Sequence, residues 1–183
     1  MNQEFAGYSL TRSMTGGGMT KFYVPIDAPQ IRYVLRVPDT VIARDRKSRQ
    51  RFFHGGEVIA RLHAPQPHPN IVRFIKAGIE DKMPYMVLEY VESRTLRDLI
   101  LYREPLLTEN VMIFIRQLAN VIRYVHSRGY LHLDVKPENV LIRPDGRLVL
   151  IDFDLALPRK RFFKNCLLYT SPSPRDRTRS RMP

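Results

Sequence analysis

A chain of 183 residues, 44% of them hydrophobic and 10% aromatic, is long enough to fold around a sizeable core. Its net charge of +12 would normally indicate nucleic acid or an anionic membrane as a partner, but eight Lys and Arg against one Asp lie from Pro158 onward, which leaves only +5 elsewhere. One cysteine excludes an internal disulfide, no Cys/His cluster has zinc spacing, and no run of about 18 apolar residues offers a spanning helix.

The N-terminal half has the pattern of a sheet with one helix. Three β-prone runs, YSL, KFYVPI and IRYVLRV, separated by Gly and Pro, predict a small antiparallel sheet over residues 8–37. A helix is expected over residues 48–62, although Gly55 and Gly56 interrupt its apolar pattern. After the proline-rich HAPQPHPN, the runs IVRFIKAGI and PYMVLEYV predict two further strands.

The second half changes to a helical period. Thr108 is a plausible N-cap, and apolar residues recur at intervals of three and four up to Gly129, which predicts the clearest helix of the chain. These residues are Val111, Phe114, Ile115, Leu118, Ile122 and Val125. The runs VLI and LVLI flank RPDGR and predict a hairpin, and a boundary between two lobes is expected near residues 92–94.

The segment 166–183, CLLYTSPSPRDRTRSRMP, shifts to Ser, Pro and Arg without apolar periodicity. As protein sequence it predicts a disordered basic tail. Its first six residues are also the in-frame translation of TGTCTCTTATACACATCT, part of a transposase-type adapter used in DNA sequencing. We favour the adapter interpretation, which would place the last authentic residue near Asn165.

The segments HLDVKPENVLI (132–142) and LIDFDLAL (150–157) carry the chemistry. Transfer of a phosphoryl group needs a carboxylate near the acceptor hydroxyl and oxygen ligands for Mg²⁺, converging on one cleft. The two segments closely resemble the catalytic loop, H-R-D-x-K-x-x-x-N, and the metal-binding loop, D-F-G, of eukaryotic protein kinases.

This resemblance implies an α+β bilobal fold. Residues 1–92 would form an N-lobe of antiparallel sheet plus one helix, and residues 93–157 the start of a mainly helical, incomplete C-lobe, with 158–183 as the tail. Because such a C-lobe lacks packing partners, we expect the apolar stripe of the helix at 108–128 to face solvent and the chain to aggregate.

The resemblance also implies residue roles. Asp134 would accept or orient the proton of the substrate hydroxyl, and Lys136 would lie near the transferred phosphate. Asn139 and Asp152 would bind Mg²⁺. YMVLEYVE is similar to the kinase hinge, in which Leu88 would border the adenine pocket while Glu89 and Val91 would offer it backbone groups.

The kinase pattern breaks where a strand lysine should meet the phosphates, because this chain has Arg36 there. Arginine prefers bidentate pairing, so Arg36 is expected to pair with Glu57, the candidate glutamate of the N-lobe helix. In the glycine-rich loop, Gly16 and Gly18 match the first two glycines, and Lys21 stands at the third. Lys21 is either a substitute for the missing lysine, as in the with-no-lysine kinases, or a solvent-facing strand residue.

Two smaller departures concern the loops themselves. Leu133 replaces the arginine that normally receives an activation-loop phosphate, which argues against control by phosphorylation of that loop. Asp154 replaces the glycine of D-F-G and adds a third carboxylate near the metal.

The leading hypothesis is a truncated Ser/Thr-type protein kinase that uses ATP and Mg²⁺ to phosphorylate a protein substrate. The alternative is a pseudokinase, a nucleotide-binding or scaffolding module without useful turnover. A nucleic-acid binder is a third reading, weakened because the charge lies largely in the tail. A cytoplasmic or nuclear location, without membrane or specific nucleic-acid partners, is expected.

Overall fold

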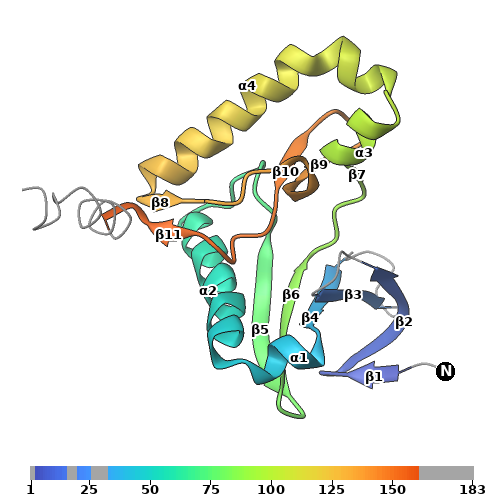
Figure 1. The fold of residues 1–183 in the computed structure, drawn as a ribbon, viewed down its shortest axis with the longest axis vertical. Coiled ribbons are helices and arrows are strands. Elements are labelled where there is room, and N and C mark those ends of the chain that lie inside the picture. The colour runs from blue at the N-terminus through green and yellow to red at the C-terminus, as the bar shows by residue number, and fades with distance from the viewer. Residues whose placement is uncertain (1–2, 16–19, 26–32, 161–183) are drawn as a thin grey trace, which may run out of the picture.

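The computed structural model describes residues 3–15, 20–25 and 33–160, and its N-terminal half is a six-stranded antiparallel sheet (Figure 1). The strands follow the order β1-β2-β3-β4-β6-β5. Their bounds are β1 (Gln3–Phe5), β2 (Tyr8–Thr15), β3 (Thr20–Pro25), β4 (Tyr33–Pro38), β5 (Phe74–Glu80) and β6 (Met83–Glu89). The five predicted strands are therefore confirmed.

Strand β1 was not predicted. It pairs with β2 through a tight turn at Ala6 and Gly7, whose φ values of 54° and 76° match the primed turns that join twisted strands. The β5–β6 hairpin turns in the same manner at Asp81 and Lys82, with φ values of 48° and 65°. Neither Asp81 nor Lys82 is a glycine, but Asp is among the residues that tolerate the left-handed conformation of a turn.

Helix α2 (Arg46–Leu62) follows the short α1 (Thr40–Arg44) and lies beside β5 in Figure 1. Asp45 caps it, because a carboxylate oxygen of Asp45 accepts a hydrogen bond from the Ser48 amide at 2.8 Å. The helix runs without a break through Gly55 and Gly56, where an interruption was expected. A β-carbon at Gly56 would lie 2.9 Å from Cε of Met86, so this glycine allows the helix to approach the sheet.

The second half begins with β7 (Arg94–Thr95), α3 (Leu96–Leu101) and α4 (Pro105–Ser127). Helix α3 was not predicted, although Thr95 and Asp98 form a reciprocal capping box that the sequence displays. The N-cap predicted at Thr108 is wrong, because the N-cap of α4 is Glu104, four residues earlier, and Pro105 suits the first helical turn. The Thr108 hydroxyl donates to the Pro105 carbonyl at 3.0 Å.

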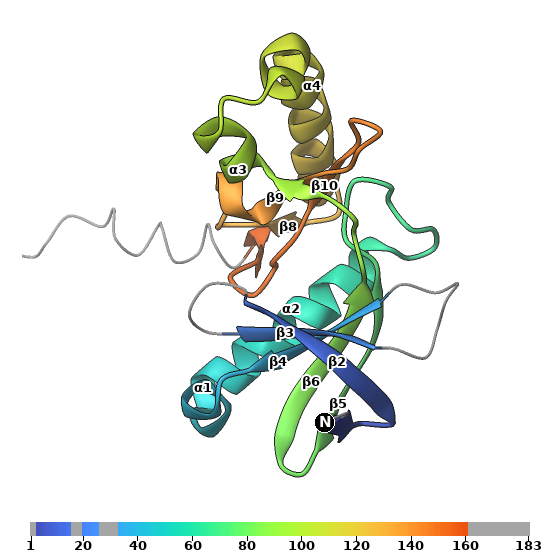
Figure 2. The ribbon, with the colours of Figure 1, turned by 90° about the vertical axis from the view of Figure 1, so that its right-hand side faces the viewer.

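Short elements then form the region below α4 (Figure 2). They are β8 (Tyr130–Leu131), a 3-10 turn (Pro137–Asn139), β9 (Val140–Ile142), β10 (Leu148–Leu150) and β11 (Leu157–Pro158). The predicted β9–β10 hairpin is confirmed, and it turns at Gly146 with a φ of 77°. Strand β7 pairs with β9, and β11 pairs with β8.

The predicted apolar stripe of α4 was expected to face solvent, and it does so only in part. Its members Val111 and Ile115 are exposed, as are the neighbouring Met112 and Ile113. Phe114 and Val125 of the stripe are instead buried, together with Val121, in the main core cluster, which also contains residues of α2, β6 and β10. Among the described residues, no helix is both long and apolar enough to span a membrane.

Candidate active site

His132 joins the two loops on which the site depends. Its Nδ1 accepts a hydrogen bond from the Asp134 amide at 3.2 Å, so its Nε2 carries the proton that bonds to the Ile151 carbonyl at 3.0 Å. The imidazole also lies 4.5 Å from the ring of Phe153, which is fully buried. Burial lowers the pKa of His132, so the ring stays neutral and suited to this bridging role.

The loop at residues 132–139, predicted to be catalytic, brings three of the predicted residues into contact. The Asp134 carboxylate accepts hydrogen bonds from Nζ of Lys136 at 2.7 Å and from Nδ2 of Asn139 at 2.8 Å. The same Nδ2 donates to the Asp134 carbonyl at 2.9 Å. Leu133, directly before Asp134, adopts a left-handed φ of 64° and leaves its side chain exposed, which turns the loop at this point. The hydrogen bond to Asp134 raises the pKa of Lys136, so its ammonium remains charged.

Asn139 also anchors the predicted metal-binding loop at residues 150–157. Its carbonyl accepts a hydrogen bond from the Ile151 amide at 3.0 Å, next to Asp152, which has a left-handed φ of 62°. Because Nδ2 of the buried Asn139 donates to Asp134, the amide oxygen is the atom left to bind a cation. Amide and carboxylate oxygens are ligands that suit Mg²⁺, which keeps several waters of its own. The side chains of Asn139 and Asp152 therefore fit the predicted metal role.

Arg36 pairs with a residue other than the one expected from the sequence. Its guanidinium forms two parallel hydrogen bonds to Asp154, Nη1 to Oδ1 at 2.8 Å and Nη2 to Oδ2 at 2.9 Å. Nη2 also lies 3.4 Å from the Asp152 carboxylate. Glu57 is exposed on α2, so the predicted Arg36–Glu57 pair is wrong.

Electrostatics at this pair have opposing causes. Burial disfavours the charge on Arg36, yet the carboxylates of Asp154 and Asp152 outweigh it and raise the pKa of Arg36. Burial raises the pKa of Asp154 to about 6, more than the nearby guanidinium lowers it. Nε of Arg36 is buried without a hydrogen-bond partner among the described residues.

The predicted adenine-pocket residues Leu88, Glu89 and Val91 lie at or just after the end of β6, where the N-terminal sheet meets the second half of the chain. Leu88 is buried at the end of β6, and the Glu89 amide donates to the Arg73 carbonyl at 2.9 Å. The Glu89 carboxylate forms a salt bridge with Arg143 of the β9–β10 hairpin. Val91 follows β6 and is also buried.

The predicted glycine-rich loop is only partly described. Gly16 and Gly18 lie outside the described residues, and so does the side chain of Lys21. The backbone of Lys21 belongs to β3 and pairs with Thr15 and Val37. Its predicted role in phosphate binding therefore stays a prediction.

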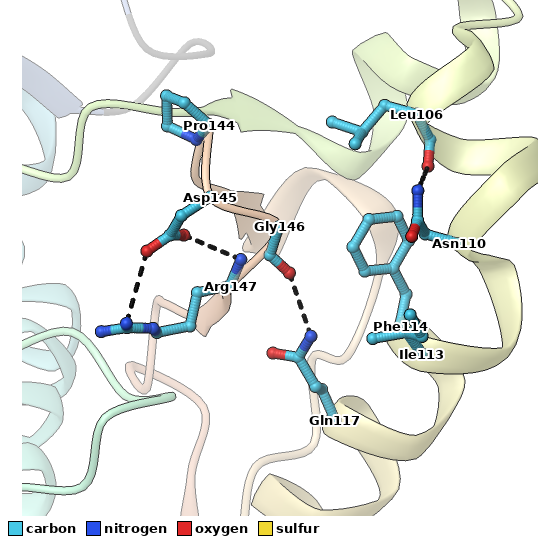
Figure 3. Close-up of a pocket in the computed structure, with 9 residues that line it drawn as sticks. All are labelled: Leu106, Asn110, Ile113, Phe114, Gln117, Pro144, Asp145, Gly146 and Arg147. Atoms are coloured by element: carbon cyan, nitrogen blue, oxygen red, sulfur yellow. Dashed lines mark hydrogen bonds and ion pairs between the residues drawn. The ribbon is translucent and has the colours of Figure 1, made fainter.

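A separate pocket lies between α4 and the β9–β10 hairpin (Figure 3). Gln117 lines it and donates from Nε2 to the Gly146 carbonyl at 3.0 Å, and Phe114 forms its apolar wall. None of the predicted catalytic or metal residues lines this pocket.

Three contributions to the site escaped sequence reasoning. Asp154 was expected near the metal and not as the partner of Arg36. Gly55 was interpreted as a weak point of a helix, yet a β-carbon there would lie 2.4 Å from Oδ1 of Asp154. Asn70 donates to the Leu148 carbonyl at 2.7 Å and so fixes the hairpin that precedes Asp152.

The chain matches a protein family and several curated proteins. Residues 40–166 match the sequence model of the family described as Protein kinase domain. The chain is 32% identical over 150 residues to Serine/threonine-protein kinase PrkC of Bacillus subtilis, covering 81% of this chain and 22% of that protein. It has the same identity over 150 residues to Serine/threonine-protein kinase PknL of Mycobacterium tuberculosis, covering 81% of this chain and 37% of that protein.

Solved structures show the same likeness. The crystal structure of the Mycobacterium tuberculosis PknI kinase domain aligns with a TM-score of 0.67 and 28% identity, covering 84% of this chain and 62% of that one. The chain thus spans less than two thirds of the length of these curated relatives and of the aligned kinase domain.

Proposed function

Because this chain belongs to the protein kinase family, we propose that it binds ATP with Mg²⁺ and transfers the γ-phosphoryl group to a Ser or Thr hydroxyl of a protein. The observation that carries the proposal is the contact set of Asp134, Lys136 and Asn139, joined to the Asp152 loop through His132. Retention of this whole set favours turnover over a pseudokinase, since a scaffold has no need of it.

Asp134 would orient the acceptor hydroxyl and receive its proton. Its carboxylate is held by Asn139 and Lys136, and a carboxylate fixed in this manner costs little reorganisation during the reaction. The Lys136 ammonium, charged and half exposed, would stabilise negative charge on the transferred group. Asn139 and Asp152 would hold Mg²⁺, which when bound neutralises phosphate charge.

The phosphates would still need a cation from the N-terminal sheet. Both terminal nitrogens of Arg36 are engaged by Asp154, so its planar fork is not free to grip a phosphate in a bidentate manner. We therefore propose that Lys21, whose strand β3 pairs with the Arg36 strand, supplies that cation. Lys21→Ala should weaken ATP binding; if only Arg36→Ala does so, this assignment is refuted.

A phosphotransfer assay tests the main proposal. The chain is incubated with radiolabelled ATP, Mg²⁺ and a mixture of Ser- and Thr-containing peptides, beside the variants Asp134→Asn and Asp145→Asn. Asp134→Asn should reduce incorporation about 100-fold or more, as expected for loss of a positioned base. Asp145 lies in a surface turn, exposed and paired with Arg147, so Asp145→Asn should leave incorporation unchanged. Equal incorporation by the chain and by Asp134→Asn would refute the proposal.

A further inference from the structure

Three residues from distant parts of the chain meet where the metal-binding loop contacts β4 and α2. They are Arg36 of β4, Gly55 of α2 and Asp154 of the loop. Arg36 is 8% exposed, and its two terminal nitrogens hold both oxygens of Asp154. Gly55 is buried against the same carboxylate, with no room for a β-carbon. The helix therefore presents bare backbone where the loop inserts an acidic side chain.

The alternation of side chains along β4 explains why Arg36 faces α2. Leu35 and Val37 point to one face, where they pack with Val87. Arg36 must then point to the opposite face, toward α2, and its guanidinium lies 5.3 Å from the centre of the Phe52 ring. A guanidinium that is buried between a sheet and a helix needs a carboxylate partner. Among the described residues, two carboxylates contact Arg36, Asp154 at 2.8 Å and Asp152 at 3.4 Å. Both belong to the loop and not to the helix.

We propose that Asp154 is a positioning residue, which acts through Arg36 to hold the metal-binding loop against the N-terminal sheet, and that Gly55 is the vacancy on α2 that admits it. The ion pair itself is independent of the proposed function, whereas its effect on Mg²⁺ and nucleotide rests on that function. Asp154 is thereby engaged away from the metal, and Asp152 is left as the loop carboxylate that serves it.

The pairing of Arg36 with Asp154 also restricts the position of Asp152. Asp152 has a left-handed φ of 62°, a conformation that residues other than glycine adopt at some cost and that surrounding contacts must maintain. The amide of Asp154 lies 3.5 Å from the Asp152 carboxylate, and Nη2 of Arg36 lies 3.4 Å from it. Anchoring Asp154 to Arg36 therefore limits the positions that Asp152 can take.

The first experiment compares Asp154→Asn with Asp145→Asn, a matched change in a surface Asp–Arg pair. In urea unfolding of the full chain, Asp154→Asn should lower the folding equilibrium constant about 10- to 100-fold, because a buried guanidinium loses its charged partner. Asp145→Asn should change that constant little. ADP affinity is then measured with and without Mg²⁺ under conditions in which all variants are folded. Asp154→Asn should reduce the gain in affinity from Mg²⁺ several-fold, an effect that lost stability alone would not cause. An unchanged Mg²⁺ gain would overturn the positioning role.

The second experiment moves the carboxylate from the loop to the helix. Gly55→Ala and Gly55→Glu are each made in the original chain and in the Asp154→Gly background. In the original chain both substitutions should lower the free energy of unfolding, because a β-carbon at position 55 would lie 2.4 Å from Oδ1 of Asp154. In the Asp154→Gly background that clash is gone, although the backbone nitrogen of residue 154 still lies 3.1 Å away and must shift slightly.

The comparison of Glu with Ala isolates the charge. In the Asp154→Gly background, Gly55→Glu should stabilise the chain relative to Gly55→Ala, because only Glu offers Arg36 a carboxylate. If Glu is no better than Ala there, or if both substitutions are equally harmful in the two backgrounds, the proposal is wrong. A chain that binds no nucleotide would refute the proposed function instead, while these unfolding results would still decide the ion pair.

Discussion

Gln117 of α4 holds the hairpin that leads into the metal-binding loop, and its truncation offers a direct test of how that loop is supported. Its Oε1 accepts from the Leu148 amide at 2.8 Å and from Nδ2 of Asn70 at 3.2 Å. Its Nε2 donates to the Gly146 carbonyl at 3.0 Å, the bond drawn in Figure 3. Gln117→Ala removes three hydrogen bonds at once without disfavouring the helix, since alanine is the best helix former.

The size of the effect follows from these contacts. At about 1 kcal/mol for each neutral hydrogen bond, with some recovery by water in the partly exposed pocket, the free energy of unfolding should fall by about 2 kcal/mol. Urea unfolding followed by circular dichroism measures it, with the neighbouring exposed Arg116→Ala as the control. If Gln117→Ala loses no more stability than Arg116→Ala, the hairpin does not depend on this network.

Three further outcomes are expected. Phe153→Ala should cost about 3–5 kcal/mol in urea unfolding, because the ring is fully buried against His132; a loss below 1 kcal/mol would contradict this packing. Tyr124→Phe should cost about 1 kcal/mol, since its hydroxyl donates to the Leu62 carbonyl, and thermal melts without any shift would count against that bond. Burial lowers the pKa of His132 from its ordinary value of 6.5. Below pH 6.5 the unfolded state therefore binds more protons than the folded state, and the free energy of unfolding falls as pH drops from 6.5 through the folded-state pKa. His132→Gln should therefore lose less stability than the original chain between about pH 7 and about pH 5, and parallel pH profiles would refute the assignment.

The sequence was most informative where the determinants are local. Strands with β-prone runs and the β9–β10 hairpin follow from patterns a few residues long, as does the contact of Asp134 with Lys136 and Asn139 within one loop. Helix boundaries were less exact because competing signals for a helix start lie close together, as Thr108 and Pro105 show.

Long-range partners were beyond such patterns. Arg36 and Asp154 are 118 positions apart, and nothing local distinguishes Asp154 from Glu57 as the partner of a strand arginine. Gly55 was equally ambiguous, because the amino-acid sequence does not distinguish a glycine that weakens a helix from one that makes room for a neighbouring side chain. Only the packing of α2 against the loop separates the two.

The missing β-carbon at Gly55 couples positions 55 and 154 of this chain. A larger side chain at position 55 would collide with the Asp154 carboxylate, so the two are not expected to occur together. Sequences related to this chain are therefore expected to include the combination of glycine at both positions, and to lack a bulky residue at position 55 together with an acidic residue at 154.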